Sequence, residues 1–166
     1  MTYVTAHYDG NHTPHCLRMV VLFHYQTNGN MKKTTTAILA AGFLVLIVSV
    51  AMLFAVIYMF PSLMTEYYNP VFRSSSFGTD WLFYVHPFVL SWAVSWFWDR
   101  FKGSFSGSVV VRAFEVALVY GVIAMVPVLW LTFSAIDISG YMVMTWLAYG
   151  IAQAFVAGLV FAKVNP

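Results

Sequence analysis

Four long apolar runs alternate with short polar segments along the chain. The runs occupy residues 37–60, 81–98, 113–136 and 141–162, and the first carries no charged side chain. A helix needs about 20 mainly apolar residues to cross a hydrocarbon core about 30 Å thick, and the second run is near the lower limit. The pattern therefore predicts an all-α integral membrane protein with four antiparallel transmembrane helices.

The first apolar run is typical of a retained anchor rather than a cleaved signal peptide. A secretory signal has an apolar region of about 7 to 15 residues, followed by small residues at the cleavage site. This run continues through Leu53, Phe54 and Phe60 into Pro61. We therefore expect it to stay in the membrane as the first span.

The segments between the runs have the chemistry of loops and turns. Residues 61–80 contain prolines and a serine run, "DRFKGSFSGS" follows the second run, and "DISG" joins the third and fourth runs. Such clusters of Gly, Pro, Ser and Asp mark turns. A connection as short as "DISG" predicts an antiparallel hairpin, in which Asp137 or Ser139 caps the start of the fourth helix.

Basic residues distinguish the two sides of the predicted bundle. With four spans both termini lie on one side, and the positive-inside rule assigns the more basic side to the cytoplasm. The side of the termini holds Lys32, Lys33, Arg100, Lys102, Arg112 and Lys163. The other side holds Arg73, Glu66, Asp80 and Asp137. We therefore expect both termini in the cytoplasm, in a multi-pass protein of a bacterial inner membrane.

Residues 1–30 form an extension ahead of the four-helix transmembrane domain, which covers 31–166. The extension has a short apolar patch at residues 17–23 and no sustained helical period. Two interpretations compete: a cytoplasmic extension, disordered or lying on the membrane surface, or upstream sequence translated from a misplaced start. The stretch "MKKTTT" favours Met31 as the native start, because it is typical of the beginning of a bacterial membrane protein.

Composition agrees with the membrane assignment. The chain is 61% hydrophobic and 8% charged, whereas soluble proteins average about 25% charged residues. Its formal charge of +2 is too small and too dispersed for a nucleic-acid surface, so the expected surroundings are the lipid bilayer. The lone Cys16 excludes an intramolecular disulfide.

The densest group of metal-ligating side chains is "HTPHC" in the extension. His12, His15 and Cys16 lie there near His7 and His24, but their spacing matches no structural zinc pattern. The chain also lacks a phosphate-binding loop, a nucleophile elbow and paired carboxylates within one span. We therefore expect no metal, no cofactor and no enzymatic activity.

The predicted spans contain the ionisable residues His86 and Glu115 and one strongly polar neutral residue, Gln153. Ionisable groups in a membrane are costly, so each is a candidate for function. Arg112 precedes Glu115 by one turn, which favours an ion pair at the boundary. The position of His86 near the end of the second span favours a hydrogen-bonded residue at the membrane interface. The weaker alternative is that His86 and nearby aromatic residues bind haem or quinone.

Small residues recur at four-residue spacing in the last two spans. The stripes are Ala113, Ala117 and Gly121 in the third span and Gly150, Ala154 and Gly158 in the fourth. Small residues at this spacing let helix backbones approach closely in lipid. Gln153 borders the second stripe, which favours a buried hydrogen bond between helices, whereas Glu115 lies far from the first stripe.

The second span has two dissimilar sides. Tyr84, Pro87, Ser91, Ser95 and Trp98 form the predicted packing side, and Trp81, Phe88, Trp92 and Trp96 form an aromatic side for lipid or a partner subunit. Together with the small-residue stripes, this favours a structural or interaction subunit of the membrane, as a homo-oligomer or with another membrane protein. The alternative is a small oligomeric transporter or channel that uses His86, Glu115 and Gln153.

Overall fold

The structure, a computed structural model, describes residues 15–72 and 77–165, with side chains for 32–72 and 80–165. The chain divides into two compact units, Met1–Thr35 and Thr36–Pro166. The described part of the first unit, 15–35, is helical. The side chains of the histidines and the cysteine in "HTPHC" are not among those that the structure describes.

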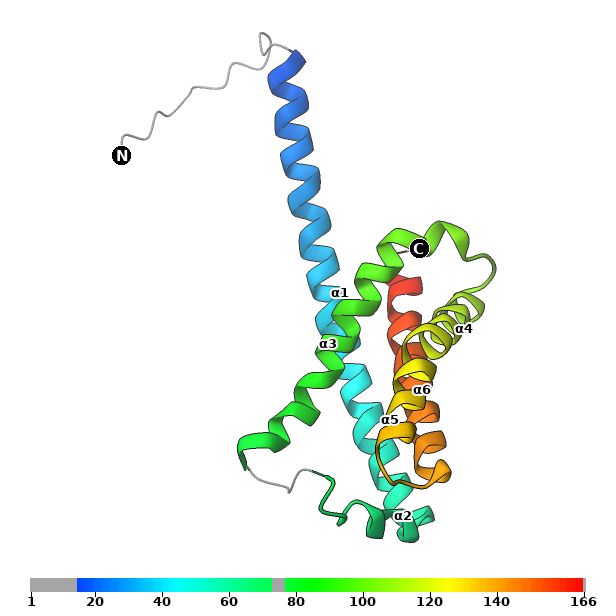
Figure 1. The fold of residues 1–166 in the computed structure, drawn as a ribbon. Coiled ribbons are helices and arrows are strands. Elements are labelled where there is room, and N and C mark those ends of the chain that lie inside the picture. The colour runs from blue at the N-terminus through cyan, green and yellow to red at the C-terminus, as the bar shows by residue number, and fades with distance from the viewer. Residues whose placement is uncertain (1–14, 73–76, 166) are drawn as a thin grey trace. The chain divides into compact units, whose positions relative to one another are not determined.

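The described part of the chain consists of helices joined by turns (Figure 1). The elements in chain order are α1 (His15–Met59), α2 (Pro61–Glu66), α3 (Phe77–Phe101), the 3-10 turn η1 (Lys102–Ser104), α4 (Val109–Tyr120), the π-helical η2 (Gly121–Met125), α5 (Val126–Ala135) and α6 (Gly140–Val164). The second unit therefore contains the last part of α1 and all later elements.

Three helical stretches are long and apolar enough to span a membrane. Among the described residues they are Lys32–Met59, Val109–Ala135 and Gly140–Val164. These correspond to the first, third and fourth predicted spans, and the chain is accordingly an all-helical, multi-pass membrane protein by length and composition. The long helix α3 is not among them, because its Trp, Tyr, His and Ser side chains make it less apolar.

Two local elements differ from the sequence-based expectation. The helix α1 begins at His15, in a stretch without a sustained helical period, so helical structure precedes Met31. The start of the native protein at Met31 stays a prediction. The segment after the first span is not entirely loop, because Pro61 opens the short helix α2, where its fixed φ and missing N–H suit the first helical position.

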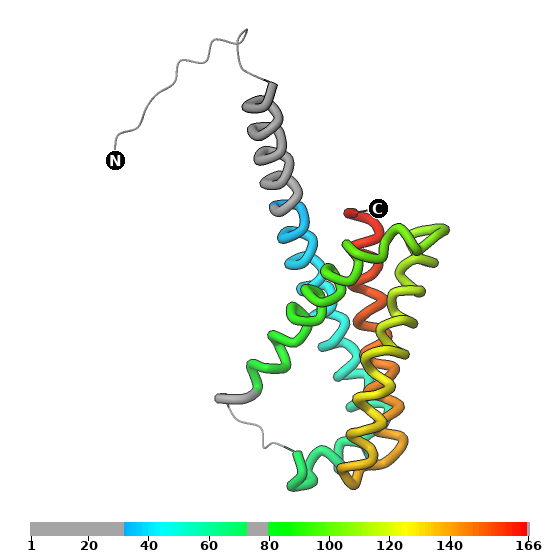
Figure 2. Tube along the Cα trace, turned by 45° about the horizontal axis from the view of Figure 1, so that its top comes forward, coloured from blue at the N-terminus to red at the C-terminus, as the bar shows by residue number. Residues whose placement is uncertain are grey.

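The π-helical turn η2 has an identifiable cause in the sequence. Pro127 follows it and has no N–H to donate to the carbonyl four residues earlier. The chain widens by one residue, so that the N–H of Val126 donates to the carbonyl of Gly121, five residues back. The helices α4 and α5 are therefore continuous through η2, and Figures 1 and 2 both show them running alongside α6.

The core of the second unit is formed by α1, α3, α4 and α6. Its buried apolar residues are Ala37, Ala41, Val45, Leu90, Val94, Trp98, Val116, Ala157, Phe161 and Ala162. The helices α1 and α3 meet closely where Phe88 covers Gly42, and a Cβ at Gly42 would clash with the Phe88 ring. A larger residue at this position would therefore displace the aromatic ring.

The carboxyl end of α6 is held by side chains from α3 and α4. Trp98 Nε1 donates to the Asn165 carbonyl at 2.8 Å, and an Arg112 guanidinium nitrogen donates to the Ala162 carbonyl at 3.0 Å. The Asn165 side chain accepts from Lys102 Nζ and donates to Asp99. These contacts give hydrogen-bond donors to carbonyls that a helix end leaves without partners. The positive charges of Lys102 and Arg112 also interact favourably with the negative end of the helix dipole.

The opposite end of the unit joins α2 to the start of α6. Ser139 Oγ accepts from the N–H of Met142 at 3.1 Å, so Ser139, one of two predicted capping residues, is the N-cap. Glu66 accepts a hydrogen bond from the N–H of Ser139 at 3.1 Å. A second apolar cluster, formed by Leu63, Ile138 and Met142, lies at the same end of the unit.

Candidate functional site

Gln153 forms a buried hydrogen bond between two helices. Its amide nitrogen donates to Ser49 Oγ of α1 at 2.8 Å, and Ser49 in turn donates to the Val45 carbonyl at 2.6 Å. Both Gln153 and Ser49 are 1% exposed. The helix α6 is thereby joined to α1 by a polar contact that lies within an apolar core.

Glu115 and Arg112 do not form the hydrogen-bonded ion pair expected from their spacing. Arg112 reaches across to the Ala162 carbonyl and lies 5.1 Å over the Trp98 ring. The Arg112 Nε and the Glu115 Oε2 are both buried without a hydrogen-bond partner in the described part of the chain. The guanidinium of Arg112 thus bonds to a carbonyl at the end of α6 and not to Glu115.

His86 is exposed on α3, next to the buried Pro87. Within residues 32–72 and 80–165, no hydrogen bond or ion pair connects His86, Glu115 and Gln153 with one another. No group of three or more His, Cys, Asp or Glu side chains among the described residues is placed to hold a metal ion. Each of the three candidate residues therefore has its own, separate surroundings.

The two stripes of small residues face one another. All six residues are buried: Ala113, Ala117, Gly121, Gly150, Ala154 and Gly158. A Cβ at Gly158 would lie 3.1 Å from the Ala113 Cα, so the backbones of α4 and α6 are nearly in contact there. At Gly150 the neighbour is instead the flexible end of Met125, 2.6 Å from such a Cβ.

The two sides of α3 largely follow the pattern predicted for the second span. Pro87, Ser91, Ser95 and Trp98 are buried, whereas Trp81, Trp92 and Trp96 are exposed. Tyr84 and Phe88 are exceptions, because Tyr84 is exposed and Phe88 packs edge-on against Phe43 of α1. The exposed residues Trp81, Trp92 and Trp96 are called the tryptophan face below.

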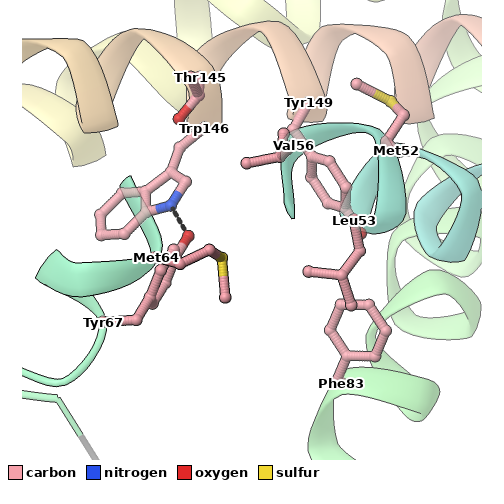
Figure 3. Close-up of a pocket in the computed structure, with 9 residues that line it drawn as sticks. All are labelled: Met52, Leu53, Val56, Met64, Tyr67, Phe83, Thr145, Trp146 and Tyr149. Atoms are coloured by element: carbon pink, nitrogen blue, oxygen red, sulfur yellow. Dashed lines mark hydrogen bonds between the residues drawn. The ribbon is translucent and has the colours of Figure 1, made fainter. Parts of the chain in front are cut away.

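A cavity of about 240 Å³ lies where α1, α2, α3 and α6 approach one another (Figure 3). Its apolar wall consists of Met52, Leu53, Val56, Met64 and Phe83. The remaining lining residues, Tyr67, Thr145, Trp146 and Tyr149, each carry a polar atom on a largely apolar body. Apolar walls with a few polar groups are the usual composition of sites for small molecules.

The polar groups of this cavity are incompletely paired. Trp146 Nε1 donates to the Tyr67 hydroxyl at 2.7 Å, drawn as the dashed line in Figure 3, and Thr145 donates to the Met142 carbonyl. The Tyr149 hydroxyl is buried near Ser49 but forms no hydrogen bond of acceptable geometry with the described residues. The cavity wall therefore lies next to the Ser49–Gln153 contact.

The sequence did not indicate Ser49, Tyr67, Trp146 or Tyr149 as site residues. A serine in an apolar run has an ordinary explanation, because it can donate to a carbonyl of its own helix, as Ser49 does. Tyr and Trp near span ends are common at membrane interfaces. Only the fold brings these residues together.

No protein-family model, curated protein or solved structure matches this chain.

Proposed function

We propose that the chain crosses the membrane four times, with α3 as the second span. The 25 residues of α3 rise about 37 Å, more than the hydrocarbon thickness of about 30 Å. Its residues Leu90, Val94 and Trp98 belong to the same core as α1 and α6, both of which contain candidate spans. This shared core supports α3 as a span stabilised by its neighbours.

The distribution of charge supports both termini in the cytoplasm of a bacterial inner membrane. Lys102 and Arg112 contact the carboxyl end of α6, whereas Glu66 contacts its amino end. Basic residues mark the cytoplasmic side of membrane proteins. The end of α6 that carries the cations is accordingly the cytoplasmic one in this proposal.

Single-cysteine labelling tests this topology. In a Cys16→Ser background, Gly103→Cys lies in η1 at the proposed cytoplasmic end, and Asn69→Cys lies in the turn after α2. A membrane-impermeant maleimide added to cells with a permeable outer membrane labels Asn69→Cys at once. It labels Gly103→Cys only after the inner membrane is opened. Immediate labelling at both positions contradicts four spans.

The function that we propose is non-enzymatic: an interaction subunit that binds a second membrane protein or another copy of itself through the tryptophan face. The observation that carries this proposal is Trp92, which is 63% exposed. On the proposed span it lies only about 4 Å from the midpoint. The indole N–H of Trp92 has no acceptor among the described residues. Trp96, one turn further along α3, differs because the guanidinium of Arg100 covers its exposed ring.

The physical argument concerns the indole N–H. Tryptophan is favoured at the membrane–water interface, where its N–H can bond to water or headgroups, but lipid tails provide no acceptor. A polar group without a partner in hydrocarbon costs free energy. A neighbouring subunit that places a carbonyl or hydroxyl against Trp92 removes this cost and covers the rings at the same time.

The test is assembly in native membranes after removal of this N–H. We expect Trp92→Phe to weaken crosslinking to the partner, whereas Trp130→Phe does not. Trp130 is also highly exposed but lies about 12 Å from the midpoint of the Val109–Ala135 span, closer to the interface than Trp92. A wild-type chain that runs only as a monomer, with no partner crosslinked in membranes, contradicts the proposal.

Glu115 provides the observation for a second candidate, a small oligomeric transporter or channel. A buried carboxyl oxygen without a partner in a span is a candidate for proton or ion binding. Four helices alone rarely enclose a polar path, so this function also requires an oligomer. Ion flux into liposomes that falls for Glu115→Gln, but not for Glu66→Gln at the end of α2 and outside the spans, supports transport. Equal flux for both variants and the wild type removes it.

A further inference from the structure

The cavity of Figure 3 has a lining that specifies the chemistry of its occupant. None of its nine lining residues is charged, and most of its wall is apolar or aromatic. A charged ligand would lose its hydration there without gaining an ionic partner, which is strongly unfavourable. The lining therefore selects a neutral molecule with an apolar body.

A hydrogen-bond donor in the wall selects an acceptor on that molecule. The Tyr67 hydroxyl accepts from Trp146 and keeps its own proton, for which the described residues provide no acceptor. The Tyr149 hydroxyl is fully buried beside Ser49, so a molecule in the cavity contacts the ring of Tyr149 and not its hydroxyl. One tyrosine hydroxyl with a proton to donate matches a ligand with a carbonyl oxygen.

The position of the cavity indicates how such a ligand arrives. Met52 and Leu53 lie in the last turns of α1, and Thr145 lies in the second turn of α6, so the cavity is at the end of the unit that contains α2. Its volume of about 240 Å³ is below the range of about 300 to 1,000 Å³ that holds a drug-sized molecule. It therefore suits a head group, with an attached chain extending into the lipid.

We infer that this cavity binds the carbonyl-bearing head of a neutral amphipathic lipid, with Tyr67 donating a hydrogen bond to a carbonyl oxygen. Trp146 positions the Tyr67 hydroxyl by donating to its oxygen, which leaves the Tyr67 proton available to a ligand. Lipids with a quinone ring and lipids with a glycerol ester share this chemistry. The inference is independent of the tryptophan face and of the partner proposed for it.

The experiment is native mass spectrometry of the full chain in detergent, titrated with three lipid probes. Two are neutral, a benzoquinone with a decyl tail and dioctanoylglycerol, and the third is the anionic dioctanoyl phosphatidic acid. We expect saturable binding of one molecule of a neutral probe, and the tighter neutral probe identifies the source. We expect Tyr67→Phe to weaken it about three- to tenfold, the effect of one hydrogen bond.

Two further variants separate the cavity from general lipid adsorption. Tyr58→Phe removes the same hydroxyl from a tyrosine that is 81% exposed and does not line the cavity, so it leaves affinity unchanged. Leu53→Trp fills the cavity and abolishes binding, while helical content by circular dichroism is retained. Non-saturable uptake of both neutral probes, equal affinity for phosphatidic acid, or equal losses in Tyr58→Phe and the cavity variants each overturns the inference.

Discussion

The helix α6 is joined to α4 and to α1 by two different kinds of contact. Against α4 it presents small residues, and at Gly158 the two backbones nearly touch. Against α1 it presents the amide of Gln153, which bonds to Ser49. Lipid tails are as apolar as leucine side chains, so hydrophobicity alone does not drive helices together in a membrane. The first contact gains dispersion energy from proximity, and the second gains specificity from one pair of atoms.

The difference teaches where each contact is vulnerable. A close backbone approach cannot adjust to a larger side chain, because main-chain atoms stand directly in its way. A buried hydrogen bond tolerates a change of volume better, but loss of one partner leaves the other without compensation. The next two predictions test this contrast and a third tests the carboxyl end of the same helix, from the largest expected effect to the smallest.

Gly158→Leu is expected to have the largest effect. Its side chain meets the Cα and carbonyl oxygen of Ala113, and we expect a loss of about 2 to 3 kcal/mol in the free energy of unfolding. The measurement is reversible unfolding in mixed micelles followed by circular dichroism. Gly140→Leu is the matched control, because a Cβ there meets nothing within 4 Å. Equal losses in the two variants would show that the α4–α6 approach is not what stabilises the fold.

Ser49→Ala and Gln153→Met are expected to have intermediate and unequal effects. Ser49→Ala leaves the buried amide of Gln153 without its acceptor and costs about 1 to 2 kcal/mol. Gln153→Met leaves Ser49 bonded to the Val45 carbonyl and costs about 0.6 kcal/mol, the average for hydrogen bonds in a membrane protein. The same unfolding assay measures both variants and the double variant. An additive double variant would indicate that the two side chains are not coupled.

Asn165→Ala is expected to have the smallest effect. It removes the side-chain bonds to Lys102 and Asp99 but keeps the backbone carbonyl that accepts from Trp98. Because these side-chain bonds are only partly buried, the expected loss is about 0.5 kcal/mol. Trp98→Phe, which removes the bond to that carbonyl, is the comparison and is expected to cost more. A larger loss for Asn165→Ala in the unfolding assay would place the main support of this helix end in the side chain.

The helices and their packing sides were accessible from the sequence for a physical reason. Lipid requires every backbone polar group to be paired within the helix, so apolar runs translate directly into helices. The stripes at Ala113 and Gly158 repeat at helical spacing, and these residues lie at the α4–α6 contact. Four-residue spacing is a property of one helix, and it is visible without knowledge of its neighbour.

The cavity and the pairing of charges were not accessible, because they depend on several helices at once. Arg112 has a carboxyl one turn away, yet it bonds to the Ala162 carbonyl of a helix distant in sequence. Tyr67 and Trp146 meet only because α2 turns the chain against the start of α6. Local spacing ranks neighbours on the same helix first, whereas the bonds of these residues lie across helices.

The π-helical turn η2 sets the rotational phase of the longest packing surface in the second unit. In an unbroken α-helix, residues spaced by four rotate about 40° at each step, so a stripe that begins at Ala113 would have turned by about 160° at position 129. A π turn holds more residues than an α turn and therefore offsets part of this rotation. Leu129 is still buried. Removing one residue from Gly121–Met125 would thus act less as a shortening than as a twist of all that follows.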